Sequence, residues 1–259
     1  MEWLNVREYR KDMNEILRAI QVVLVEPSHP GNIGAVARSM KTMGIDRLII
    51  VNPSRFPDPQ AEWRAAGAKD VLDNAIVRSS VSEAISDSDF IVGTSARSRR
   101  IPWPMGFVET VTKEIITQVS SGNAKNIAIL FGRESSGLTN EELELCHMHL
   151  QIPASPNYSS LNLAMAVQVV CYELFKQTAT ENINRIQGSD SDLWDRPLAT
   201  YEHVEKFMEH LEAVLLRSSF LDPKNPGKTL SRLRRLLIRA RPDETEIQIL
   251  RGILTHLGD

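Results

Sequence analysis

Short runs of mainly aliphatic and β-branched residues alternate with amphipathic segments over roughly the first 180 residues. Such runs are typical of strands buried on both faces of a parallel sheet. We expect strands at 21–25, 47–51, 89–93, 126–130 and 148–152. Between them, apolar side chains recur at helical spacing, for example from Ile33 to Met43 and from Val108 to Val119. This alternation predicts an α/β fold with a mostly parallel sheet and helical crossovers.

The pattern changes after residue 180. Residues 181–198 are polar and carry a Ser/Asp cluster, which is typical of a linker. Beyond them, three apolar stripes at helical spacing and no strand pattern predict a small all-helical domain. Because so short a chain buries little core, we expect this domain to pack on the main domain or on a partner subunit. The predicted organisation is an N-terminal extension (1–20), an α/β domain (21–180), a linker (181–198) and a C-terminal helical domain (199–259).

Composition and charge narrow the classes of function. With 42% hydrophobic and 24% charged residues, the 259-residue chain has the composition of a globular protein. The net charge of −3 means that any nucleic acid must be bound by local clusters of basic residues. No apolar run approaches the ~20 residues of a membrane span, and no signal peptide is apparent. We therefore expect a cytoplasmic protein that is not associated with a membrane. Two cysteines exclude a disulfide framework, and Cys146, His147 and His149 lack a second group of metal ligands, so we expect no metal.

Loops that follow the predicted strands carry the candidate chemistry, because ligands of open α/β sheets bind beyond the carboxyl ends of the strands. In the first loop, glycines allow close approach of the backbone, Asn32 can cap the next helix, and Arg38 lies less than two turns further on. This arrangement indicates a ligand-binding loop; the alternative is an ordinary capped helix whose arginine points into solvent. In the second loop, Arg97, Arg99 and Arg100 suit phosphate or RNA-backbone contact, the alternative being a solvated basic loop.

Two further loops point to a ligand that is not a nucleoside triphosphate. The segment 131–139 nearly matches a phosphate-binding loop, but Leu138 stands where that motif has its lysine, and no GxGxxG occurs anywhere. The segment 152–166 is stiffened by prolines, which suits a preformed wall for a small ligand. There Ser159 or Ser160 is expected to cap the following helix.

Four ordered segments together resemble one known family. They are NIGAVARSMKTMGIDRLIIVNP, GTSARSRRIPWP, LFGRESSGLTNEEL and IPASPNYSSLNLAMAVQVVCYEL. In this order they resemble the SPOUT methyltransferases, most closely the bacterial branch that methylates the ribose 2′-OH of cytidine or uridine 32 in tRNA. The resemblance is strong over residues 20–178 and weaker over the helical tail. It implies a trefoil-knotted α/β domain, S-adenosylmethionine as cofactor, tRNA as substrate, and a homodimer with RNA entering between its subunits.

The resemblance also assigns roles to residues. The implied cofactor walls are Thr94, Ser95, Ala96, Gly132, Ile152, Ser159, Ser160 and Leu161. The implied catalytic and substrate-facing set is Asn32, Arg38, Glu134, Ser160 and Asn162. The candidates for RNA contact come from the basic loops and from a stretch of the helical tail that has several basic residues and no acidic ones. For the tail, the alternative is a helix face exposed to solvent. They are Arg97, Arg99, Arg100, Arg133, Arg232, Arg235 and Arg239.

The mechanism turns on Arg38, the general-base candidate that the resemblance implies. Its pKa above ~12 makes it a poor base, so we favour a role in holding a substrate phosphate and stabilising the forming alkoxide. Transient deprotonation with help from a substrate phosphate is the alternative. Other nucleotides of tRNA, ribosomal RNA, and a catalytically silent RNA-binding protein on the same scaffold stay open as alternative functions. A metabolite-binding or nucleotide-hydrolysing enzyme is disfavoured by Leu138.

Overall fold

The computed structural model describes residues 15–95, 103–155, 157, 160–185, 198–223 and 227–257. Its centre is a sheet of seven strands in the order β3-β2-β1-β6-β4-β7-β5. All six neighbouring pairs are parallel, as the alternation of elements predicts. The strands are β1 (Ile20–Val25), β2 (Arg47–Val51), β3 (Ile76–Arg78), β4 (Phe90–Thr94), β5 (Met105–Phe107), β6 (Ile127–Phe131) and β7 (Met148–Gln151).

The five strands expected from the sequence are all present, with ends that differ by at most one residue. Strands β3 and β5 were not predicted. Each has three residues, lies at one edge of the sheet and is largely exposed. A short exposed strand produces no apolar run, so neither periodicity nor composition marks it. The trefoil knot stays a prediction, because the loop before β5 and the loop before α8 include residues outside the described part.

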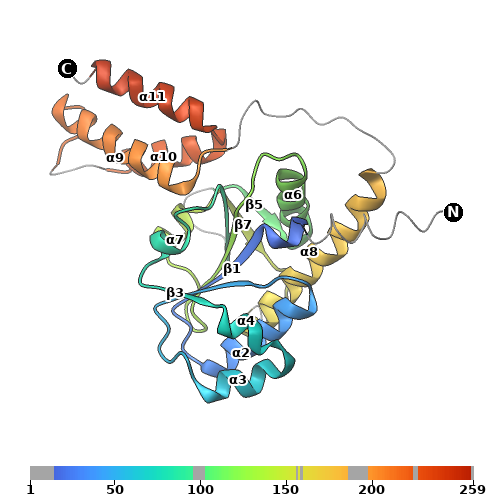
Figure 1. Cartoon of the computed structure of the whole chain (residues 1–259). Helices are drawn as coiled ribbons and strands as arrows, with labels where there is room; N and C mark the ends of the chain where they lie inside the picture. Colours follow the sequence, from blue (N-terminus) through green and yellow to red (C-terminus); the bar gives the residue numbers. More distant parts are fainter. Residues whose placement is uncertain are drawn as a thin grey trace.

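The sheet separates two apolar layers. Alternate residues of β1 point to opposite faces: Val22 and Leu24 join one cluster, Val23 and Val25 the other. On the first face pack α2 (Pro30–Thr42), α4 (Lys69–Asp73), α6 (Val108–Ser120) and α8 (Leu163–Arg185). On the second face lie α5 (Val81–Ala84) and α7 (Asn140–Glu144). Figure 1 shows α2, α4 and α8 gathered on one side of the sheet and α7 on the other.

One helix pair on the first face packs unusually closely. Helix α3 (Pro59–Ala65), followed by the short 3-10 helix η1 (Ala66–Ala68), lies against α2. A Cβ on Gly34 would come within 2.0 Å of the carbonyl oxygen of Ala61. Only glycine lets the two backbones approach this far. This contact fixes α2 against α3, and α2 carries two of the candidate catalytic residues, Asn32 and Arg38.

The observed N-terminal caps of the helices agree only in part with those predicted from the sequence. Thr139 and Glu142 form the capping box that their spacing predicts. Helix α2 is capped by His29, whose ring accepts from the Gly31 N–H, so the prediction that Asn32 caps this helix is wrong. The proline at the first helical position places the start three residues earlier. At α8, Asn162 rather than Ser160 accepts from the backbone N–H of Ala164, at 2.9 Å.

The helical C-terminal region has a core of its own. Helices α9 (Tyr201–Arg217), α10 (Thr229–Ala240) and α11 (Glu244–Leu257) enclose a separate apolar cluster, and Figure 1 shows them as a group beside the sheet. Several contacts hold this group on the α/β domain, among them those of Tyr201 and Arg241. Tyr201 is buried in the second layer, and Arg241 pairs with Glu114 at 2.6 Å and lies 5.0 Å from the ring centre of Phe90.

Two segment ends differ from the expected organisation. Ile16 and Leu17, in the predicted N-terminal extension, are buried in the main core. Helix α8 continues to Arg185, into the segment predicted as a linker. No helix among the described residues is long and apolar enough to cross a membrane.

Candidate active site

A cavity of about 400 Å³ opens beyond the carboxyl ends of β4, β6 and β7. Its volume lies in the range of small-molecule sites, roughly 300–1,000 Å³. Every cofactor-binding candidate whose structure is described lines it, while Ala96 and Ser159 lie outside the described residues. The six that line it are Thr94, Ser95, Gly132, Ile152, Ser160 and Leu161.

A second cavity, of about 440 Å³, lies at the opposite end of the sheet. It is bordered by the first residues of β1 and β2 and by charged side chains such as Arg47, Asp70 and Glu83. Although it is slightly larger, no candidate residue faces it. Ligands of open α/β sheets bind beyond the carboxyl ends, so the cavity at that end is the candidate site.

The wall between β6 and α7 is built from backbone. Arg133 and Gly137 exchange two backbone hydrogen bonds, of 3.3 and 2.9 Å, which fold the loop tightly. A Cβ on Gly132 would lie 2.1 Å from the backbone carbon of Gly137, so this position admits only glycine. Gly137 itself adopts a φ of +71°. The loop therefore offers peptide groups and small side chains to a ligand, as expected for a cofactor held largely by backbone contacts.

Glu134 is the centre of a hydrogen-bonded cluster beside this wall. One of its carboxylate oxygens accepts from the backbone N–H and the hydroxyl of Ser28, at 3.0 and 2.9 Å. The other accepts from the His29 N–H at 3.2 Å and from Nδ2 of Asn32 at 2.9 Å. The cluster joins the end of β6 to the start of α2.

Asn162 extends the cluster to the start of α8. Its Nδ2 donates to Oδ1 of Asn32 at 3.0 Å, while its own Oδ1 caps α8. Because a carboxylate only accepts hydrogen bonds, the Asn32 amide must turn its nitrogen toward Glu134. Three of the five catalytic candidates are thus brought together from three separate segments of the chain.

The charge of Glu134 is strongly held. Partial burial acts to raise the pKa of Glu134, but the hydrogen bonds from Asn32 and Ser28 outweigh it and lower this pKa to about 2. The group is ionised throughout the physiological range and has little affinity for a proton. Glu134 can therefore orient donors and stabilise positive charge, but it is unsuited to act as a general base.

The other catalytic and RNA-contact candidates that the structure describes lie outside the hydrogen-bonded cluster around Glu134. Arg38 is exposed on α2, and Ser160 lines the cavity. Arg232 and Arg239 are exposed on α10 with Arg235 half-buried on the same face. The three loop arginines Arg97, Arg99 and Arg100 lie outside the described residues.

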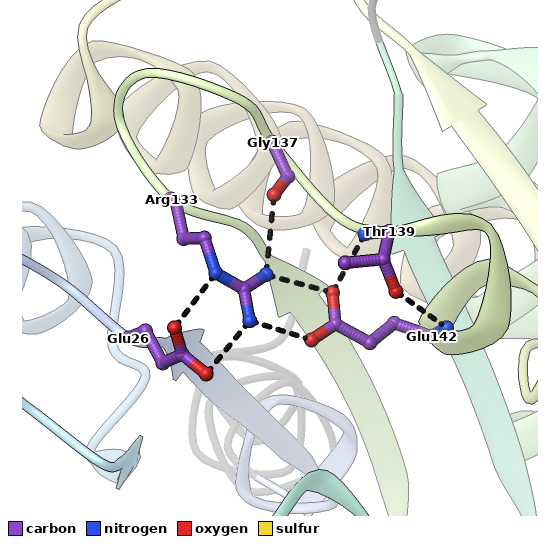
Figure 2. A network of polar contacts seen from close by, with 5 residues as sticks. All are labelled: Glu26, Arg133, Gly137, Thr139 and Glu142. Carbon is purple, nitrogen blue, oxygen red and sulfur yellow. Dashed lines mark hydrogen bonds and ion pairs between the residues drawn. The ribbon is translucent and has the colours of Figure 1, made fainter.

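Arg133, an RNA-contact candidate, points into a network of carboxylates. Figure 2 shows its guanidinium between Glu26, which directly follows β1, and Glu142 on α7. Both partners raise the pKa of Arg133. The sequence interpretation did not include Glu26, Ser28 or His29 among the catalytic or cofactor-binding candidates, although His29 is the one neutral base in these loops. Ser28 and His29 belong to the same Gly-rich loop, which was the only available signal.

The Cys-His-x-His segment serves the core. The His147 ring accepts from the Ile91 N–H, and burial lowers the pKa of His147 to about 3, so this ring is neutral. His149 stacks on Trp103, with ring centres 5.7 Å apart, and the indole N–H donates to the Cys146 carbonyl. Within the described part of the chain, no three His, Cys, Asp or Glu side chains are grouped to hold a metal ion.

Comparison with known proteins agrees with this arrangement. Residues 19–172 match the SpoU rRNA Methylase family, and residues 202–258 match the C-terminal domain of the tRNA methyltransferase TrmJ. The chain is 46% identical over 242 residues to the tRNA (cytidine/uridine-2′-O-)-methyltransferase TrmJ of Pectobacterium atrosepticum, covering 93% of this chain and 98% of that protein. Its relative in Cronobacter sakazakii is also 46% identical, with 93% and 97% covered.

Solved structures extend the likeness to the whole fold. A crystal structure of TrmJ from Z. mobilis ZM4 superposes with a TM-score of 0.78 at 32% identity, covering 92% of this chain and 99% of that one. A probable methylase family protein from Haemophilus influenzae Rd KW20 superposes with a TM-score of 0.62 at 38% identity, covering 93% and 96%. The family resemblance drawn from the four motifs is confirmed. This chain belongs to the SpoU methylase family and, within it, groups with the TrmJ relatives.

Proposed function

We propose that this chain transfers a methyl group from S-adenosylmethionine to the ribose 2′-OH of cytidine or uridine at nucleotide 32 of tRNA. The observation that carries the proposal is the cavity at the carboxyl ends of the strands, which adjoins the Glu134 cluster through their shared loop. The reaction is the one that the names of the TrmJ relatives state. Nucleotide 32 rests on the resemblance to that branch.

The cavity suits the cofactor by its size and its lining. S-adenosylmethionine would supply a methyl group made electrophilic by the sulfonium to which it is bonded. Thr94, Ser95, Gly132, Ile152 and Leu161 would hold it, with the glycine leaving room for backbone contact. Leu138 and Leu150 add apolar surface to the same cavity. A small number of polar groups in a partly apolar cavity is typical of cofactor sites.

The chain's own residues position the ribose. Glu134 and Asn162 hold the Asn32 amide in one orientation and, among the described residues, leave one of its Nδ2 hydrogens without a partner. This N–H can donate to an oxygen of the incoming nucleotide. A preoriented donor costs no reorganisation when the substrate arrives. Ser160, on the cavity wall, is placed to contact substrate or cofactor.

Arg38 acts on the charge of the substrate. Its exposed side chain can contact an RNA phosphate and stabilise the alkoxide that forms as the 2′-OH loses its proton. Glu134, with a pKa of about 2, does not take this proton. The proton therefore passes to solvent or to a phosphate of the substrate.

The assembly and the location follow from the same proposal. We infer a homodimer in which tRNA lies between the subunits, with the exposed Arg232 and Arg239 of α10 contacting its backbone. The α/β domain (21–180) would carry the chemistry and the helical domain (199–259) would carry part of the tRNA contact, joined through 181–198. Because tRNA is cytoplasmic in bacteria, the enzyme would work in the cytoplasm.

A labelling experiment tests this function. The protein is incubated with tritiated S-adenosylmethionine and tRNA that lacks the modification, followed by nuclease digestion and nucleoside mass spectrometry. A matched tRNA carries a 2′-deoxy sugar at nucleotide 32 only. We expect label as 2′-O-methylcytidine or 2′-O-methyluridine in the first tRNA and none in the second. Equal labelling of both would place the methyl group elsewhere, and tRNA binding without cofactor binding would indicate a silent RNA-binding protein.

A further inference from the structure

We propose that Arg133 is a positioning residue that holds the cofactor wall in shape, and that it does not contact RNA. The inference rests on the proposed function only for the nature of the ligand. Arg133 is one of the residues that line the cavity, and its guanidinium is held between the two carboxylates of Glu26 and Glu142 (Figure 2). These three side chains are called the Arg133 clamp below.

All three nitrogens of the Arg133 guanidinium have partners within the protein. Nε donates to one oxygen of Glu26 at 2.8 Å, and Nη2 forms an ion pair with the other oxygen, also at 2.8 Å. Nη1 and Nη2 donate to the two oxygens of Glu142, both at 3.0 Å. The second hydrogen of Nη1 points to the Gly137 carbonyl at 3.5 Å. Of the five N–H groups of a guanidinium, four hydrogen-bond within the protein, and Nη2, which carries the fifth, is also ion-paired with Glu26. The guanidinium is therefore poorly placed to bind a phosphate.

The net charge of the clamp also disfavours binding of the RNA backbone at this place. Two carboxylates surround one guanidinium, so the cluster carries a net charge of −1 when all three groups are ionised. The hydrogen bond from Arg133 lowers the pKa of Glu26, which keeps that carboxylate ionised. A phosphate approaching the cluster would meet repulsion rather than a free cation.

The clamp ties three segments around the cavity. Glu26 directly follows β1 and begins the loop whose Ser28 donates hydrogen bonds to Glu134. Glu142 completes the capping box of α7, where it accepts from the Thr139 N–H at 2.7 Å. Between them, Arg133 is followed in the chain by Glu134. Arg133 and Glu134, two adjacent residues of opposite charge, therefore both anchor the loop between Gly132 and Leu138. We infer that the conformation of this wall is restricted.

The consequence is a wall that is shaped before the ligand arrives. A preorganised site avoids the cost of ordering the loop on binding. Loss of the clamp should therefore weaken cofactor binding without changing the RNA surface. Bidentate pairs of this kind depend on the planar fork of arginine, which lysine cannot reproduce.

The test compares Arg133→Gln, Arg133→Lys and Glu26→Gln with a matched control. The control is Lys69→Gln, since Lys69 also bridges two carboxylates, but at the exposed surface of α4. Glu26→Gln keeps the Arg133–Glu142 pair and serves if the arginine variants fold poorly. Calorimetry measures the Kd for S-adenosylmethionine, filter binding measures the Kd for tRNA over a salt series, and hydrogen exchange follows the amides of Gly137 and Thr139.

We expect Arg133→Gln to weaken cofactor binding about tenfold or more, the fold-change of 1.4 kcal/mol. Arg133→Lys and Glu26→Gln should have smaller effects, with tRNA affinity within about twofold. The loop amides should exchange faster in all three variants while those of β1 stay protected, and Lys69→Gln should match wild type. Unchanged cofactor affinity and exchange, with weaker tRNA binding and a shallower salt dependence, would overturn the clamp and favour RNA contact. Hydrogen exchange needs no cofactor, so it decides the clamp even if wild type fails to methylate tRNA, a failure that would contradict the proposed function alone.

Discussion

Replacing Glu134 with glutamine tests whether a partly buried negative charge organises the site. Each carboxylate oxygen of Glu134 accepts two hydrogen bonds. Glutamine keeps the shape but presents an NH2 group on one side, where it faces donors. At least one backbone N–H, of Ser28 or His29, then loses its partner.

The size of the effect follows from the lowered pKa. A decrease from 4.5 to about 2 corresponds to an upper limit of about 3 kcal/mol, at 1.36 kcal/mol per pH unit. Solvent screens this partly exposed group, so we expect about 1–2 kcal/mol, which agrees with hydrogen bonds to charged groups. Because the folded pKa is depressed, the stabilisation is present above pH 4.5 and is lost as the pH falls toward 2.

Urea unfolding at pH 7 and pH 4, at one protein concentration, measures the difference. Glu134→Gln should be less stable than wild type by about 1–2 kcal/mol at pH 7, and the gap should narrow at pH 4. The control is Glu209→Gln, an exposed carboxylate on α9, which should match wild type. A gap below about 0.3 kcal/mol at pH 7, or one of equal size at pH 4, would refute the role of this charge.

Three further predictions concern the cavity, the cluster and the tRNA surface. Gly132→Ala should lower cofactor affinity more than tenfold in calorimetry, because its Cβ would collide with the Gly137 backbone. Asn162→Ala should lower the free energy of unfolding by about 1 kcal/mol through the lost α8 cap, and it should lower kcat because Asn32 loses its partner. Removing the charges of Arg232 and Arg239 should weaken tRNA binding and reduce its salt slope by about two.

Each of these predictions has a control and a contradicting result. Gly67→Ala, where the added Cβ meets nothing within 4 Å, should bind cofactor like wild type, and equal affinity of Gly132→Ala would show that the wall can move. Unchanged kcat in Asn162→Ala would remove Asn32 from the reaction. A salt slope unaltered by loss of Arg232 and Arg239 would place the tRNA away from α10.

Local patterns in the sequence were enough for most of the secondary structure. Buried strands such as β2 need a continuous apolar run, and Arg47–Val51 is found as expected. The capping box of Thr139 and Glu142 depends on residues three apart, so it is visible in the sequence. Strands β3 and β5 were missed because they exist through pairing with β2 and β7, not through a pattern of their own.

The sequence also located the candidate site, because Gly-rich loops after buried strands meet at one edge of a parallel sheet. The sequence alone was thus enough to predict the α/β class, the helical tail and the loops that line the cavity. What these loops do to one another was decided by tertiary structure. Asn32 and Glu134 lie 102 residues apart, Asn32 and Asn162 130, and Glu26 and Arg133 107. Hydrogen bonds over such separations leave no periodicity, so only folding shows that Asn32 is an oriented amide and that the Arg133 guanidinium is held between two carboxylates.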